Sequence, residues 1–160
     1  MRRPKAAGAA RLSIALVMLA AACSGGSDSS TAAPPSDVTL TLAPSARGHI
    51  LTIAGTTNLP NGVLISYEVT PSDTSQVEFA DGFAPVTDGR FTAIVDLNHW
   101  PAGDVEVWAA FQTVLDTTHE QPNAVIDRYG ALGERLTGPN VTRAGDVRRV
   151  ETTAVVTLGG

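Results

Sequence analysis

Apolar and polar side chains alternate along most of residues 38–158, and this alternation limits what the chain can fold into. In the clearest segment, one side of an extended chain carries Val63, Ile65, Tyr67 and Val69. Successive side chains of a strand point to opposite faces, so a period of two residues indicates a strand with one face in a core. The alternation therefore predicts an all-β domain.

Turn residues separate the alternating segments. A glycine that follows Asn or Asp accepts the positive φ of tight hairpins, so we expect turns at residues 61–62, 81–82 and 88–89, and a further turn at residues 100–103. Seven or eight strands with little helix predict an antiparallel β-sandwich. The expected strands are residues 38–42, 50–55, 63–70, 77–79, 83–87, 91–97, 105–115 and 148–158.

Residues 118–145 interrupt the pattern, because they are richer in Gly, Pro and charged residues. Pro122 at a first helical position and Gly130 at a C-terminal cap predict one short helix, Asn123–Tyr129, before the last strand. Long connections in compact domains often carry function. We therefore treat residues 118–145 as an insertion in which a site is expected.

The N-terminal residues have the layout of a secretory signal peptide. Four basic residues lie among the first 11, and residues 12–22 form an apolar stretch that ends in small residues. A membrane-spanning helix needs about 20 apolar residues, which is nearly twice the length of this stretch. We expect a signal peptide at residues 1–22 and no permanent transmembrane helix.

Residues 19–23, Leu-Ala-Ala-Ala-Cys, resemble the end of a bacterial lipoprotein signal, although Ala20 stands where Leu is usual. The resemblance implies that Cys23, the only cysteine, carries palmitate-type acyl chains and becomes the new N-terminus after cleavage. Residues 23–37, rich in Ser, Gly and Pro, are then the lipidated cysteine and a flexible tether, and residues 38–160 are the folded domain. The alternative is an ordinary cleaved signal followed by a free thiol.

The segment 53–62, Ile-Ala-Gly-Thr-Thr-Asn-Leu-Pro-Asn-Gly, and the strand that follows it to Val69 resemble immunoglobulin-like and fibronectin-like domains of bacterial surface lipoproteins. Further support comes from residues 88–91, 101–103 and 129–139. The resemblance covers residues 38–158 and implies an extracytoplasmic β-sandwich on the cell envelope. It supplies no catalytic residue, and the inter-sheet cysteine pair of antibody domains is absent.

The chain beyond the expected signal is acidic. Four of the 11 basic residues precede Cys23, which leaves 7 basic residues against 16 acidic ones, a net charge of −9. Nucleic-acid binding requires a cationic surface, and so does electrostatic adhesion to anionic lipid. The charge argues against both, so the expected membrane contact is the lipid on Cys23.

No motif predicts an enzyme. The chain has no Gly-x-Ser-x-Gly elbow, no phosphate-binding or dinucleotide-binding loop and no calcium-binding loop. His49, His99 and His119 lie in separate segments without a second His or Cys at metal-ligand spacing. We expect no catalytic residue, no cofactor and no metal. An acid–base pair among the 16 carboxylates stays open, and with it an unrecognised hydrolase.

Trp108 is the first candidate for a ligand contact. It lies on the opposite face of its strand from Val105, Val107 and Phe111. If that apolar face is core, Trp108 points outward, where an indole can stack on a sugar or a partner protein. The alternative is that residues 118–145 cover it.

Arg135 and Arg143 are the second and third candidates. They belong to a C-terminal third that carries most of the positive charge of the domain. Together with Arg148 and Arg149 they form either a patch for an acidic partner or surface charges paired with Asp146 and Glu151.

Three hypotheses about function follow. The leading one is a membrane-anchored, non-enzymatic module that contacts a protein or an envelope polymer. The second is a carbohydrate-binding or small-ligand-binding module that uses Trp108. The third is the unrecognised hydrolase.

Overall fold

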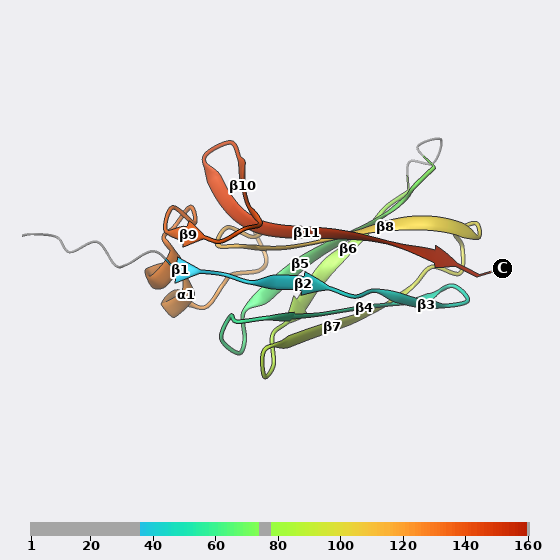
Figure 1. Ribbon diagram of the computed structural model, residues 1–160, viewed down its shortest axis with the longest axis horizontal. Coiled ribbons are helices and arrows are strands. Elements are labelled where there is room, and N and C mark those ends of the chain that lie inside the picture. Colours follow the sequence, from blue (N-terminus) through green and yellow to red (C-terminus); the bar gives the residue numbers. More distant parts are fainter. Residues whose placement is uncertain (1–35, 74–77, 160) are drawn as a thin grey trace, which may run out of the picture. The chain divides into compact units, whose positions relative to one another are not determined.

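Two antiparallel sheets pack face to face in the computed structural model, which describes residues 36–73 and 78–159 (Figure 1). The predicted antiparallel β-sandwich, with one short helix before the last strands, is confirmed. The predicted signal peptide, Cys23 and most of the predicted tether lie outside the described residues. Within the described part of the chain, no helix has the length and apolarity needed to cross a membrane.

The larger sheet has five strands in the order β10-β11-β8-β5-β6, all antiparallel. The long pairing between β8 and β11 runs from Gly103 opposite Leu158 to Gln112 opposite Arg149. The strands of this sheet are β5 (Leu64–Pro71), β6 (Ala80–Pro85), β8 (Gly103–Gln112), β10 (Val141–Ala144) and β11 (Val147–Leu158).

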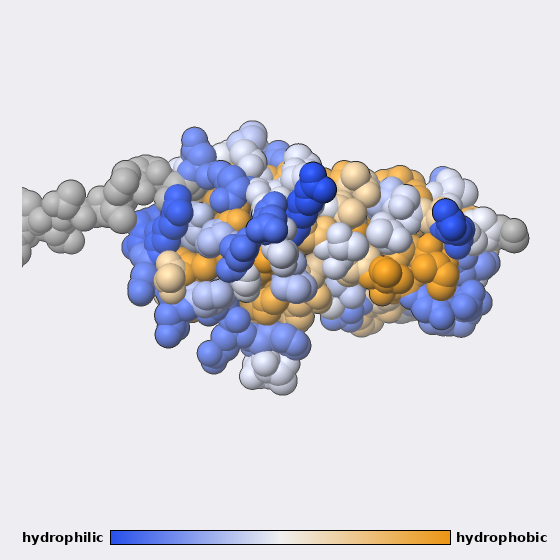
Figure 2. All heavy atoms as spheres, turned by 90° about the horizontal axis from the view of Figure 1, so that it is seen from below, coloured by the Kyte–Doolittle hydropathy of each residue, from blue (hydrophilic) through white to orange (hydrophobic). Residues whose placement is uncertain are grey.

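The smaller sheet is built around β4, Ile50–Thr57. Two short strands, β2 (Leu40–Leu42) and β3 (Ser45–Arg47), pair one after the other with one edge of β4, and β7 (Arg90–Asp96) pairs with its other edge. Pro44 separates β2 from β3 because proline has no N–H for the ladder and is confined to edge strands. Figure 2 shows the domain from the side on which β4 and β7 lie.

The order of strands is that of an immunoglobulin-type sandwich. The sheet β2-β4-β7 corresponds to strands A, B and E, and the sheet β11-β8-β5-β6 corresponds to G, F and C with an added neighbour of C. The two-residue turn at Asp88 and Gly89, both at positive φ, links β6 in one sheet to β7 in the other. The turn predicted at residues 88–89 is therefore confirmed.

Side chains that alternate in the sequence fill the space between the sheets. Most apolar positions of β4, β5, β7, β8 and β11 face inward, and Trp100 is buried with them. Burying a side chain of this size contributes about 1.5–3 kcal/mol. The largest fully buried side chains include Tyr129, Phe91, Phe111, Leu51, Ile53, Ile65, Leu97, Leu136 and Leu158.

The turn predicted at residues 81–82 is wrong. Asp81 and Gly82 lie inside β6, paired with Glu68 and Tyr67 of β5. A Cβ at Gly82 would lie 2.5 Å from the Tyr67 hydroxyl oxygen, so glycine here admits a neighbouring side chain and makes no turn. The strand predicted at residues 77–79 is also misplaced, because β6 begins only at Ala80.

The insertion forms the predicted helix α1, Asn123–Tyr129. Pro122 occupies the N-cap position, one residue before the predicted place. The insertion also holds β9 (Leu136–Thr137), which pairs in parallel with β1 (Ser36–Asp37). The last two residues of the predicted tether, 23–37, thus belong to the folded domain. The Val38 amide extends the pairing by donating to the Thr137 carbonyl at 2.9 Å.

Candidate functional site

Trp108 lies on the outer face of the larger sheet. Its neighbours Val107 and Ala109 are buried, and the alternation of β8 therefore turns the indole away from the core, as predicted. In the sheet, Trp108 stands between Glu68 of β5 and Thr153 of β11. It is half-buried, so part of the ring is open to contact.

The indole is held in place by two charged side chains of β11. Trp108 Nε1 donates a hydrogen bond to Glu151 Oε2 at 2.9 Å, and the guanidinium carbon of Arg149 lies 5.1 Å from the centre of the ring. Arg149 Nε is 2.6 Å from the same carboxylate oxygen, a contact close enough for an ion pair although its angle is poor for a hydrogen bond. The three side chains form a unit that we call the Trp108 cluster.

Glu151 is the charged centre of the Trp108 cluster. Burial raises the pKa of Glu151, but hydrogen bonds from Trp108 and Thr142 and the charge of Arg149 outweigh that effect. The pKa of the Glu151 carboxyl therefore lies below its ordinary value of 4.5. At neutral pH the carboxylate is ionised and keeps both partners in position.

A shallow hollow of about 270 Å³ lies beside the Trp108 cluster. Glu68, which lies opposite Trp108 on β5, and Glu106, two residues before Trp108 on β8, are exposed at its margin. The lining residues are Glu68, Thr70, Glu106, Trp108 and Arg149. The arrangement offers an aromatic surface, hydrogen-bond acceptors and one hydroxyl, which suits a polar ligand or a polar protein surface.

The insertion does not cover the Trp108 hollow, because none of the residues that line it belongs to 118–145. Its one recorded contribution here is Thr142 of β10, whose side chain bonds Glu151. Trp108 thus lies on the outer face of β8, as expected from the alternation, and it is partly exposed beside this hollow.

Arg135 does not reach this hollow. Its Nε donates to the carbonyl of Arg128 at 2.8 Å, and its Nη2 donates to the carbonyl of Asp127. These carbonyls belong to the last turn of α1, which has no following turn to supply donors. Arg135 therefore caps the helix, and the prediction that it contacts a ligand finds no support in its geometry.

Arg143 is exposed in β10, directly opposite Arg148 of β11. The Arg148 guanidinium turns to the carbonyls of Glu134 and Leu136, at 3.4 and 3.5 Å. The structure thus separates the three predicted contact residues. Trp108 joins Arg149 and Glu151 instead, and of the predicted pairings of arginines with Asp146 and Glu151, the one between Arg149 and Glu151 is confirmed.

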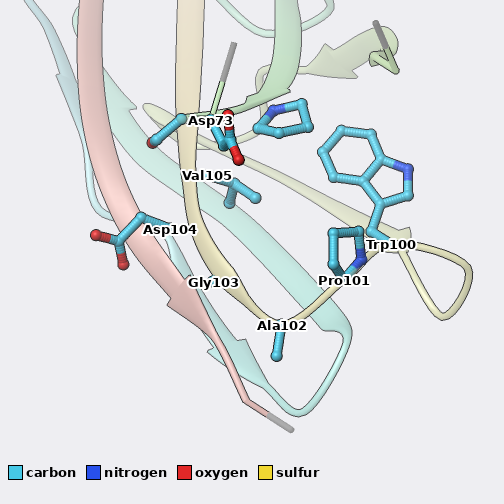
Figure 3. Close-up of a pocket in the computed structure, with 9 residues that line it drawn as sticks. Asp73, Trp100, Pro101, Ala102, Gly103, Asp104 and Val105 are labelled. Atoms are coloured by element: carbon cyan, nitrogen blue, oxygen red, sulfur yellow. The ribbon is translucent and has the colours of Figure 1, made fainter. Parts of the chain in front are cut away.

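Two further hollows lie beside the turn at residues 100–103 and beside the insertion. One of about 470 Å³ is lined by residues 71–73 and 100–105, where the Trp100 indole and Pro101 form one wall and Asp104 points away from them (Figure 3). Trp100 is 4% exposed and donates from Nε1 to His99 Nε2 at 3.0 Å, so it belongs to the core and its indole is held in place.

The other hollow, of about 360 Å³, is lined by residues 113–116 just after the end of β8 and by residues between 119 and 131 of the insertion, with Asp116 and His119 at its margin. Amide groups of Thr118 and His119 bond the Asp116 carboxylate, and the pKa of Asp116 falls to about 2, chiefly through the Thr118 amide. His119 stacks on Phe83 with ring centres 4.4 Å apart. Among residues 36–73 and 78–159, no three His, Cys, Asp or Glu side chains are placed to hold a metal ion.

The sequence matches no protein-family model and no curated protein. The resemblances to a lipoprotein signal and to surface lipoprotein domains stay predictions.

Proposed function

We propose that this chain is a lipid-anchored, non-enzymatic binding protein of a bacterial cell envelope, and that its folded domain contacts a protein or an envelope polymer on the extracytoplasmic side. The anchor is supported by the signal-like residues 1–22 followed by Cys23. The acidic composition of the domain supports attachment by lipid, since an acidic protein is repelled by anionic headgroups.

The observation that carries the binding role is the Trp108 cluster. An indole that is half-buried on a sheet face, bonded to Glu151 and flanked by Arg149, is held rigid before any partner arrives. Rigid aromatic residues lose little conformational entropy on binding, and Trp and Arg are the residue types enriched among binding hot spots. The outer face of β5, β8 and β11 is therefore the proposed binding surface.

A carbohydrate-binding or small-ligand module is the second candidate. It is favoured by the hollow of about 270 Å³ beside Trp108, because sugars stack on exposed indoles and bond to carboxylates such as Glu68 and Glu106. The two candidates use the same surface and differ only in the chemistry of the partner.

The test is retention of the mature chain on envelope fragments from the source bacterium lacking this protein. Cys23→Ser removes the lipid from the experiment, so that retention reports the domain alone. We expect Trp108→Ala to weaken retention at least tenfold, as expected for a central hot spot. Thr39→Ala, a change at an exposed position outside both sheets, is the matched control.

Digestion of the fragments with protease identifies the class of partner, because a protein partner is lost and a polysaccharide is kept. Equal retention of the Trp108→Ala and Thr39→Ala variants would contradict the proposed surface. A hydrolytic turnover that disappears in Glu68→Gln or Glu106→Gln would contradict the non-enzymatic role.

A further inference from the structure

The outer face of the smaller sheet carries two exposed isoleucines. Ile94 of β7 is 72% exposed and Ile50 of β4 is 39% exposed. Figure 2 shows apolar atoms gathered on this face toward the end of the domain at which β3 lies. Single exposed apolar residues are common on proteins, so what matters is the pattern of side chains around this pair.

Residues that lie side by side on β3, β4 and β7 form rows across this face, and one such row has a cation at one end, an apolar residue in the middle and an anion at the other end. The strand register places Arg47 of β3 beside Ile50, and Asp96 of β7 on the other side of Ile50. Arg47 and Asp96 are both exposed. Neighbouring strands are about 4.8 Å apart, so the two charges lie on opposite flanks of the same row.

The next row has an exposed isoleucine on one side of β4 and a hollow on the other side. Thr52 lies at its centre, with Ile94 on the β7 side and Ser45 on the β3 side. An open hollow of about 490 Å³ lies on the β3 side, lined by Ser45, Ala46, Arg47, Ile50 and Thr52. The most exposed isoleucine thus stands across β4 from a space that has no side chain in it.

Both rows are self-complementary under one symmetry operation. A two-fold axis along β4, in the plane of contact, exchanges the β3 and β7 sides and keeps each position along the strand. Arg47 then meets Asp96 of a second copy, Ile94 enters the hollow beside Ser45 of that copy, and the two Ile50 side chains meet on the axis. A two-fold axis across the strands would instead set Arg47 against Arg47.

We propose that this protein forms a two-fold symmetric dimer through the outer face of the smaller sheet. Such an interface is isologous, since the same patch serves both copies. The dimer leaves the outer face of the larger sheet, with the Trp108 cluster, uncovered on both copies. Dimerisation therefore duplicates the proposed binding surface and does not compete with it.

The contact area predicts a weak dimer in solution. Three strands and four rows of side chains cover about 14 Å by 25 Å, or roughly 350 Å² per copy, against about 800 Å² in a stable complex. Attachment to a membrane confines the copies to one surface and raises their effective concentration. That last step rests on the proposed lipid anchor, whereas the geometry of pairing does not.

Disulfide trapping tests the geometry in the Cys23→Ser chain, where an introduced cysteine is the only thiol. Ile50→Cys lies on the proposed axis, so it should give a disulfide-linked dimer on mild oxidation. Ile94→Cys and Ser45→Cys should each stay largely monomeric alone and cross-link when the two variants are mixed. Thr92→Cys, an exposed position on β7 away from the axis, sets the background.

Exchanging the charges of Arg47 and Asp96 tests the same two-fold axis through the dimer dissociation constant. Arg47→Asp and Asp96→Arg should each weaken the dimer measured by sedimentation equilibrium, about two- to fivefold for an exposed pair, and the double exchange should restore it. Cross-linking of Ile50→Cys no greater than that of Thr92→Cys would overturn the proposal, and so would a double exchange no better than the single ones. Both experiments omit the lipid and leave Trp108 intact, so neither outcome depends on the proposed function.

Discussion

Glu151→Gln is the change that tests the Trp108 cluster most selectively. The amide oxygen can still accept the bond from Trp108 Nε1, now 2.9 Å long, while the negative charge that Arg149 contacts is removed. The Arg149 and Glu151 side chains are 29% and 22% exposed, so their pairing contributes about 0.5–1 kcal/mol. Weakening a charge-assisted bond to a neutral one adds about 0.5–1 kcal/mol. We therefore expect Glu151→Gln to lower the free energy of unfolding at pH 7 by about 1–2 kcal/mol.

The effect should depend on pH with a definite sign. Because the pKa of Glu151 is lower in the folded state than its usual 4.5, its contribution is fully present above about pH 4.5 and is lost as the pH falls through the folded-state pKa. Urea unfolding followed by far-UV circular dichroism at pH 7 and pH 3 measures the difference between Glu151→Gln and wild type. Glu106→Gln, an exposed carboxylate in the same hollow, is the control and should change stability by less than about 0.5 kcal/mol. A destabilisation by Glu151→Gln that is as large at pH 3 as at pH 7 would refute the reasoning.

Three other predictions concern the fold and the anchor. Gln121→Leu should destabilise the domain by about 3 kcal/mol in urea unfolding. The buried Gln121 side chain makes three hydrogen bonds to the backbones of Leu64 and Gln112, and the substitution leaves these backbone groups unpaired. A destabilisation below about 1 kcal/mol would contradict this bridging role. Gly55→Ala should lower the free energy of unfolding by about 3 kcal/mol, since its Cβ would lie 2.1 Å from the Thr41 carbonyl oxygen. Gly82→Ala meets only the end of the Tyr67 side chain and should lower it by about 1 kcal/mol. Equal destabilisation of the two variants in thermal unfolding would show the reasoning to be wrong. Cys23→Ser should move the protein from the membrane pellet to the soluble fraction with an unchanged melting temperature, and a protein that stays in the pellet would have another means of attachment.

Alternation in the sequence was enough to predict most of the sandwich. It assigns each strand residue to one of two faces, and for this reason Trp108 could be placed on the outer face before its neighbours were known. The helix Asn123–Tyr129 was also predictable, since Pro122 and Gly130 restrict the backbone locally. These are short-range effects, and short-range effects can be read from one sequence.

Register and partners across strands could not be predicted in the same way. Glu151 is 43 residues from Trp108 in the chain, and their hydrogen bond depends on how β11 pairs with β8. Residues 81–82 have the composition of a turn, yet Gly82 lies in a strand because the Tyr67 side chain requires the space. Arg135 looked like a binding residue because its charge is visible in the sequence and the helix end that it caps is not.

The measurement that tests the account most directly is the intact mass of the protein extracted from the membranes of its own cells. The account predicts an N-terminus at Cys23 whose mass exceeds that of the unmodified chain 23–160 by a diacylglyceryl group, with or without a further acyl chain. An unmodified Cys23, or a chain that still carries residues 1–22, would contradict the lipid anchor on which the proposed function depends.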